Sequence, residues 1–215
     1  MFRPTNIFYK EKGNWILTVF WNSLYIAFFL LPLGINLPTP FFIISIVLGL
    51  INLFTSPRNF FLRNKALLLL PLYFVVLAIS LIYTDDLSAG TLLLIRSLSL
   101  LFFPIIFLFV KEDAATVKKL FDFLLLGLML SFVINFSMAI YDAISIVEGN
   151  IVYGSGIEWV YSFLNAIING WNHFIGVGFS KLVNPSYISL YILLVLSYYL
   201  KNKLTSRLQL SLIHI

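Results

Sequence analysis

The 215-residue chain contains no cysteine and little charge, since Asp, Glu, Lys and Arg together make up 11% of its residues. The absence of cysteine excludes disulfides, thiolate metal sites and cysteine nucleophiles. The scarcity of charge excludes an ordinary soluble domain, in which about a quarter of the residues are charged. Hydrophobic residues account for 60% of the chain, which leaves too little polar surface to cover a globule in water. These proportions predict an integral membrane protein.

The net charge of +5 does not indicate nucleic acid as a partner. The basic residues lie in short clusters between apolar runs, a pattern typical of membrane topology signals. The first apolar run follows Arg3, Lys10 and Lys12, as in a signal peptide, but no small-residue cleavage site comes after it. We therefore predict an uncleaved first span.

Six apolar runs are suited to membrane-spanning helices, which need about 20 residues to cross about 30 Å of hydrocarbon. A seventh apolar segment begins near Leu208 and continues to Ile215. We predict an all-α fold, a polytopic transmembrane helical bundle of about six spans and part of a seventh. Residues 1–215 are expected to form a single transmembrane domain. The predicted spans cover residues 15–33, 38–55, 66–83, 91–110, 120–147 and 184–200.

The distribution of basic residues predicts the orientation of the spans. Twelve of the fourteen lie in four clusters, which fall on one side of the membrane if there are six spans. The positive-inside rule assigns that side, and with it the N-terminus, to the cytoplasm. The opposite side carries Asp85, Asp86, Glu148 and Glu158. The basic clusters occupy residues 3–12, 58–65, 111–119 and 201–207.

A long loop, residues 148–183, is predicted on the side opposite the cytoplasm. Its apolar middle, IEWVYSFLNAIING at residues 157–170, is suited to a short interfacial or re-entrant helix. Its Trp and Tyr side chains are typical of anchors at the headgroup level. The alternative is that they stack on a sugar or polyprenyl substrate.

Arg96 and Lys181 are the two basic residues outside the clusters. The sequence places Arg96 near the outer end of the fourth predicted span and Lys181 at the end of the long loop. In the simpler interpretation Arg96 extends to the membrane interface and Lys181 is an ordinary loop cation. In the other, both face an outer cavity that holds an anionic substrate, since charge within a membrane is costly and usually functional.

Asn184 and Pro185 predict the start of the sixth span. An asparagine side chain accepts a backbone hydrogen bond as an N-cap, and proline suits the first helical position. Such a start would direct free N–H groups and a partial positive charge toward the loop, next to Lys181. We therefore predict that an anion binds there.

Other polar residues do not indicate a metal, a nucleotide or a nucleophile. The segment GVGFSK at 176–181 lacks the spacing of a phosphate-binding loop. His173 and His214 are far apart and have no paired carboxylate, so no metal site is predicted. No serine or threonine has the neighbours of an activated nucleophile. The chain also has no internal repeat, which disfavours a transporter built from paired halves.

The stretch from Lys181 to Tyr191 reads KLVNPSYISLY, a basic residue followed by (H/N)-P-(N/S/T)-Y and an apolar helix. This pattern resembles the O-antigen ligase and O-antigen polymerase superfamily of bacterial envelope proteins. The fourth predicted span, TLLLIRSLSLLFFPIIF with Pro104 in its inner half, is also similar to the corresponding helix of that family. The resemblance implies a multi-pass protein of the bacterial inner (cytoplasmic) membrane, with residues 148–183 as a periplasmic loop.

The resemblance implies transfer of a glycan from a polyprenyl-pyrophosphate carrier to an acceptor, with no metal or other cofactor. Cations must hold the diphosphate and stabilise the charge that develops on it; Arg96 and Lys181 are the candidates. Asn184, Pro185 and Tyr187 are expected to shape the site. The catalytic loop of the family is expected beyond residue 215, so the chain is interpreted as an N-terminal half that is inactive alone.

Two other classes of protein stay open. A polytopic transporter or flippase for lipid-linked sugars would move its substrate without forming a glycosidic bond. A non-catalytic membrane scaffold would tolerate replacement of both Arg96 and Lys181.

Overall fold

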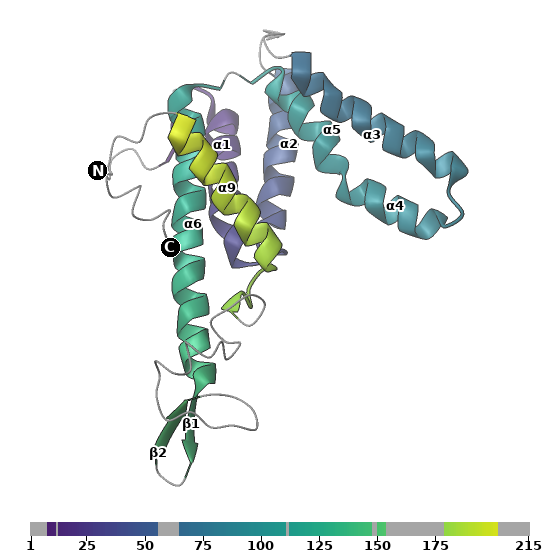
Figure 1. The fold of residues 1–215 in the computed structure, drawn as a ribbon. Helices are drawn as coiled ribbons and strands as arrows, with labels where there is room; N and C mark the ends of the chain where they lie inside the picture. The colour runs from purple at the N-terminus through teal and green to yellow at the C-terminus, as the bar shows by residue number, and fades with distance from the viewer. Residues whose placement is uncertain are drawn as a thin grey trace. The chain divides into compact units, whose positions relative to one another are not determined.

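The structure is a computed structural model that describes residues 8–11, 13–55, 65–110, 112–147, 150–153 and 179–201. It is predominantly helical, which confirms the predicted helical class (Figure 1). The chain divides into two compact units. The first comprises Met1–Leu24 and Pro40–Lys118, and the second Tyr25–Thr39 and Lys119–Ile215. Most of the long loop, with its predicted interfacial helix, and the seventh apolar segment lie outside the described residues.

The helices follow the six predicted apolar runs. The α-helices are α1 (Trp15–Leu30), α2 (Thr39–Thr55), α3 (Leu69–Ser80), α4 (Leu87–Arg96), α5 (Leu98–Phe107), α6 (Ala114–Ala143) and α9 (Pro185–Lys201). Short 3-10 helices extend α1 over Leu31–Leu33 and flank α3 at Lys65–Leu68 and Leu81–Tyr83.

Four helical segments of the described chain are long and apolar enough to cross a membrane. They are Trp15–Leu33, Ala66–Tyr83, Leu87–Phe107 and Ala114–Tyr141. Two apolar helices, Thr39–Thr55 and Pro185–Leu200, are shorter. The protein is therefore a membrane protein whose apolar helices contact the lipid bilayer.

In the first unit, small polar residues join α1 to α2. Asn14 Nδ2 donates to Asn52 Oδ1 at 3.1 Å, and the buried hydroxyls of Ser23 and Ser45 lie 2.7 Å apart. Asn14 also caps α1, because its Oδ1 accepts from the backbone N–H of Leu17 at 2.9 Å. These contacts set the antiparallel register of two helices whose other surfaces are apolar.

The helix α5 packs in the same unit through aromatic rings and one glycine. Phe107 contacts Phe20 and Trp21, with ring centroids 6.1 and 5.8 Å away. Gly49 of α2 faces Ile106, and a Cβ at this position would lie 2.7 Å from Ile106 Cδ1. The missing side chain thus lets α5 approach α2 closely.

The fourth predicted span differs from the observed helix at two points. It starts at Leu87 rather than Thr91, because Asp86 Oδ1 caps it by accepting from Ala89 N–H at 2.9 Å. It is also interrupted at Ser97, whose φ of −90° and ψ of 1° separate α4 from α5. Arg96 therefore lies midway along the helical segment Leu87–Phe107, at the interruption, rather than near the start of the segment as the predicted bounds placed it.

In the second unit, α6 packs against the end of α1 and runs beside α9 (Figure 1). A Cβ on Gly127 would collide with the backbone oxygen of Phe29, so a glycine is required where α6 crosses α1. Leu124, Val195 and Tyr199 form the buried core between α6 and α9.

The helix α6 ends before the predicted fifth span does. Residues 144–147, predicted as the end of the span, form the strand β1 (Ile144–Val147) instead. It pairs with β2 (Asn150–Tyr153) in an antiparallel hairpin in which Ile144 faces Tyr153. The β-branched residues of both strands favour extended backbone over helix.

Candidate functional site

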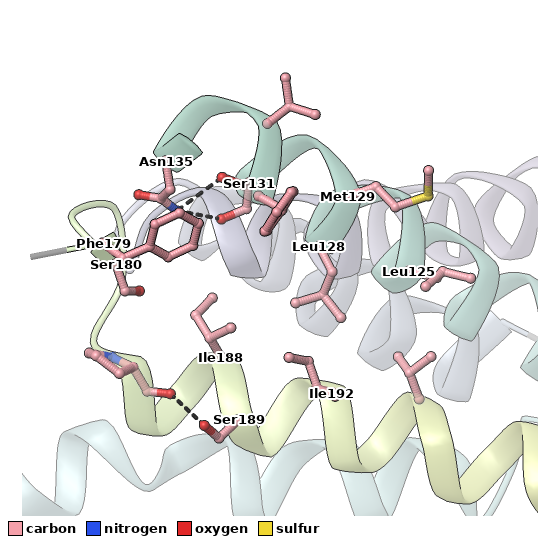
Figure 2. A pocket seen from close by; sticks show the side chains of 14 residues that line it. Leu125, Leu128, Met129, Ser131, Asn135, Phe179, Ser180, Ile188, Ser189 and Ile192 are labelled. Atoms are coloured by element: carbon pink, nitrogen blue, oxygen red, sulfur yellow. Dashed lines mark hydrogen bonds between the residues drawn. The ribbon is translucent and has the colours of Figure 1, made fainter. Parts of the chain in front are cut away.

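A cavity of about 470 Å³ lies between α6 and α9 in the second unit (Figure 2). Its size falls within the range of roughly 300–1,000 Å³ that is common for small-molecule sites. Leu, Ile, Val, Met and Phe side chains make up most of its wall, with Ser131, Asn135, Ser180 and Ser189 as the polar members. Asn135, Phe179 and Ser180 lie at one end and Leu125 toward the other (Figure 2).

Asn135 is the best-connected polar residue of this wall. Its Nδ2 donates to the backbone oxygen of Ser131 at 2.9 Å and to Ser131 Oγ at 3.2 Å. Its Oδ1 accepts from the backbone N–H groups of Lys181 at 3.1 Å and Leu182 at 3.4 Å. Two donors and two accepted bonds use the full capacity of a primary amide. Asn135 therefore links the segment before α9 to the C-terminal third of α6.

The role of Asn135 was not predicted from the sequence, although a signal was present. Asn135 stands in an apolar run, LLLGLMLSFVINFSMAI, and its side chain is 3% exposed. An amide in such a run is costly unless it is satisfied inside the protein. The pattern indicated an inward-facing residue, but it did not indicate the partner.

The predicted N-cap of α9 is confirmed, whereas the predicted free backbone N–H groups at the start of this helix are not observed. Asn184 Oδ1 accepts from the N–H of Ser186 at 2.9 Å, as expected for an N-cap. Pro185 has no N–H, and the N–H of Tyr187 donates to the backbone oxygen of Asn184 at 3.0 Å. The first turn therefore has no free N–H group for an anion, and what it offers is the partial positive charge of the helix end.

The predicted site residues near α9 take different positions. Lys181 is exposed and is not among the lining residues, and the bonds from its backbone N–H to Asn135 Oδ1 and the oxygen of Phe179 hold its backbone next to the polar end of the cavity. Pro185 lines the cavity. Asn184 is exposed and caps the helix, whereas Tyr187 is 50% exposed and is not among the lining residues.

Arg96 lies in the first unit, apart in sequence from this group. It is exposed and occupies the last turn of α4, where a cation is favoured by the helix dipole. Its predicted meeting with Lys181, which belongs to the second unit, stays a prediction.

A second polar contact joins α6 and α9 beyond the other end of the cavity. The hydroxyl of Tyr199 donates to Asp122 Oδ1, and both residues are buried. Beside them the rings of Tyr198 and Phe121 stack with centroids 4.1 Å apart. This pair was not predicted from the sequence, in which its members are separated by 77 residues.

Comparison of the chain with models of protein families, with curated protein sequences and with solved structures gave no match. The helices define the class, a helical membrane protein. Its function is inferred from the residues of the chain and the geometry of the site.

Proposed function

We propose that the chain is the N-terminal part of a bacterial envelope glycan ligase or polymerase. In this proposal it transfers a glycan from a polyprenyl-pyrophosphate carrier to an acceptor at the periplasmic face of the inner membrane. The observation that carries the proposal is the anchoring of Lys181 by Asn135 at the polar end of an apolar cavity. A cation beside a hydrocarbon-lined cavity suits a lipid that carries a phosphate. The motif from Lys181 to Tyr191 supports the same proposal.

The proposed roles follow from charge. The ammonium of Lys181 contacts the diphosphate, and the guanidinium of Arg96 provides a second, bidentate contact. A cation in contact with the diphosphate stabilises the charge that develops on it as it leaves the sugar. Asn184 and Pro185 fix the start of α9 beside Lys181, and Tyr187 is available for contact with the glycan. The base that activates the acceptor belongs, in this proposal, to residues beyond 215.

The proposal includes six spans with a cytoplasmic N-terminus. Four helices reach the length of a span, and α2 and α9 are apolar helices of 17 residues each. Seventeen residues rise about 26 Å, a few ångströms less than the hydrocarbon core of about 30 Å. Local bilayer thinning accommodates such a difference at modest cost. Six spans also place the four basic clusters on one side.

The proposal is tested by glycan transfer in membranes that contain the complete protein. Arg96→Ala and Lys181→Ala are each expected to lower transfer by about 100-fold or more, as for loss of a group that stabilises developing charge. Arg96→Lys is expected to recover part of the activity, because it restores the charge but not the bidentate contact. Lys119→Ala, which removes a cation on the predicted cytoplasmic side, is the matched control. Normal transfer by Arg96→Ala with normal membrane insertion would contradict the assignment of Arg96.

The interruption between α4 and α5 favours a second candidate, a transporter or flippase for lipid-linked sugars. Discontinuous helices often form the substrate sites of transporters, and Arg96 lies at this interruption. Movement of a lipid-linked sugar across vesicle membranes without a new glycosidic bond would identify that function. Unchanged transfer and transport after replacement of both Arg96 and Lys181 would instead indicate a scaffold.

A further inference from the structure

We propose that the cavity between α6 and α9 binds the hydrocarbon chain of an anionic lipid, with the phosphate of that lipid next to Lys181. The identity of this lipid as a polyprenyl carrier rather than a phospholipid rests on the proposed function.

The residues that line the cavity favour an apolar ligand. Within the described part of the chain, four polar residues line the cavity, and each takes part in a hydrogen bond within the protein. Asn135 uses its whole capacity and bonds with Ser131, Ser189 Oγ donates to the oxygen of Pro185 at 2.9 Å, and Ser180 Oγ donates to the oxygen of Val183. The other lining residues that the structure describes are aliphatic or aromatic, with Met129 among them. A ligand therefore gains contact area and dispersion there, as a hydrocarbon chain does.

The length of the cavity matches one leaflet of a bilayer. Its lining residues extend from Leu125 to Asn135 in α6 and from Pro185 to Val195 in α9. Each stretch rises about 15 Å, which is half of the roughly 30 Å hydrocarbon core. A linear chain that enters from one leaflet thus finds apolar contacts along its depth.

Two sets of polar contacts in the second unit link α6 with α9 and the segment before it, one at an end of the cavity and one beyond the opposite end. At one end Asn135 of α6 holds the segment that leads into α9, and beyond the other Tyr199 of α9 bonds with Asp122 of α6. The two helices are thus tied at their ends, while the stretch between leaves a volume of about 470 Å³. In a membrane, lipid surrounds the helices, and a lipid chain can therefore fill such an apolar space.

The charge at one end indicates the headgroup. Lys181 is exposed, and its backbone is fixed by Asn135. A lipid chain in the cavity would bring its phosphate to this cation, and a basic residue near the surface attracts an anionic lipid. Phospholipids and polyprenyl diphosphates share this chemistry.

Photo-crosslinking in proteoliposomes tests the inference with two probes. One is phosphatidylglycerol with a diazirine in its acyl chain, and the other is a polyprenyl diphosphate with a diazirine in its chain. Crosslinks are mapped by mass spectrometry to peptides of α6 and α9. Ile188→Trp places a large ring at the cavity wall and is expected to reduce these crosslinks about tenfold. Leu190→Trp, two residues away at a site that is 50% exposed and does not line the cavity, is expected to leave them unchanged.

The outcomes separate this inference from the proposed function. Cavity-dependent labelling by the polyprenyl probe supports both. Cavity-dependent labelling by phosphatidylglycerol alone, with no competition from polyprenyl diphosphate, supports the lipid site and contradicts the polyprenyl substrate. Equal labelling of the two tryptophan variants would overturn the lipid site, and the transfer assay would still test the function. If Ile188→Trp is not monodisperse, Ile192→Trp with Leu193→Trp as its control replaces the pair, since only Ile192 of the two lines the cavity.

Discussion

Asn135 shows how one polar residue in an apolar helix organises the candidate site. Its amide nitrogen donates to Ser131 within α6, and its amide oxygen accepts from the backbone N–H groups of Lys181 and Leu182. Asn135→Leu removes these bonds, so the N–H of Leu182 loses this acceptor, while the N–H of Lys181 keeps only its bond to the oxygen of Phe179. We expect a loss of about 1 kcal/mol in the free energy of unfolding, the scale of hydrogen bonds measured between membrane helices. Chemical unfolding in mixed micelles measures this loss.

Hydrogen exchange provides the specific readout for Asn135. The N–H groups of Lys181 and Leu182 are expected to exchange faster in Asn135→Leu than in the wild type. Ser137→Ala is the matched control, because the hydroxyl of Ser137 is exposed and bonds within α6 to Val133. Unchanged exchange at Lys181 and Leu182 would show that Asn135 does not hold this segment.

Two glycines allow a graded prediction about close helix contacts. In Gly127→Ala the added Cβ collides with the backbone oxygen of Phe29, and that backbone can retreat only if α1 moves. In Gly49→Ala the nearest atoms belong to the flexible side chain of Ile106. We expect Gly127→Ala to lower the free energy of unfolding by about 3 kcal/mol, the upper part of the range for overpacking, and Gly49→Ala by about 1 kcal/mol. Equal losses in thermal or chemical unfolding would contradict the close approach at Gly127.

The residue-scale features that were predicted from the sequence depend on residues close to one another in the chain. The cap of α9 by Asn184 and the position of Pro185 depend on neighbours within three residues, and both are confirmed. The bond between Asn135 and Lys181 joins residues 46 apart, so it depends on how α6 meets the segment before α9. The occupied N–H of Tyr187 likewise depends on the geometry of the first turn rather than on residue types.

The pairing of α6 with α9 is the element that supports the candidate site. Tyr199 and Asp122 tie these helices at the end away from Lys181. A double-mutant cycle with Tyr199→Phe and Asp122→Leu is expected to give a coupling energy of about 1 kcal/mol or more, because each variant removes one partner of a buried bond. Tyr191→Phe is the control, since its ring packs in α9 against the same core. A coupling energy near zero in chemical unfolding would contradict the bond.

Element boundaries were predictable where hydropathy decides them. The first and third predicted spans, residues 15–33 and 66–83, coincide with observed helical segments. The interruption at Ser97 was missed because hydropathy does not report backbone conformation, and the backbone there leaves the helical region. The end of α6 was missed because residues 144–147 continue the apolar run, although their β-branched side chains favour a strand.

The topology of the whole molecule is open to a direct test because the native chain has no cysteine. Each introduced cysteine is therefore the sole target of a membrane-impermeant maleimide applied to spheroplasts. With six spans and a cytoplasmic N-terminus, Asp85→Cys and Lys181→Cys are expected to react at once. Lys10→Cys, Lys118→Cys and Lys203→Cys are expected to react only after the membrane is permeabilised. Labelling of the denatured protein serves as the control for expression.

The labelling pattern separates the alternatives because each change in span number reverses a different set of positions. If only the four long helices cross and the N-terminus is cytoplasmic, Asp85→Cys and Lys181→Cys are protected and Lys118→Cys reacts. If the N-terminus is outside, Lys10→Cys reacts. If α9 alone does not cross, Lys203→Cys reacts together with Lys181→Cys. Protection of Lys181→Cys would also contradict the proposed function, since a cation on the cytoplasmic side does not meet a diphosphate at the periplasmic face.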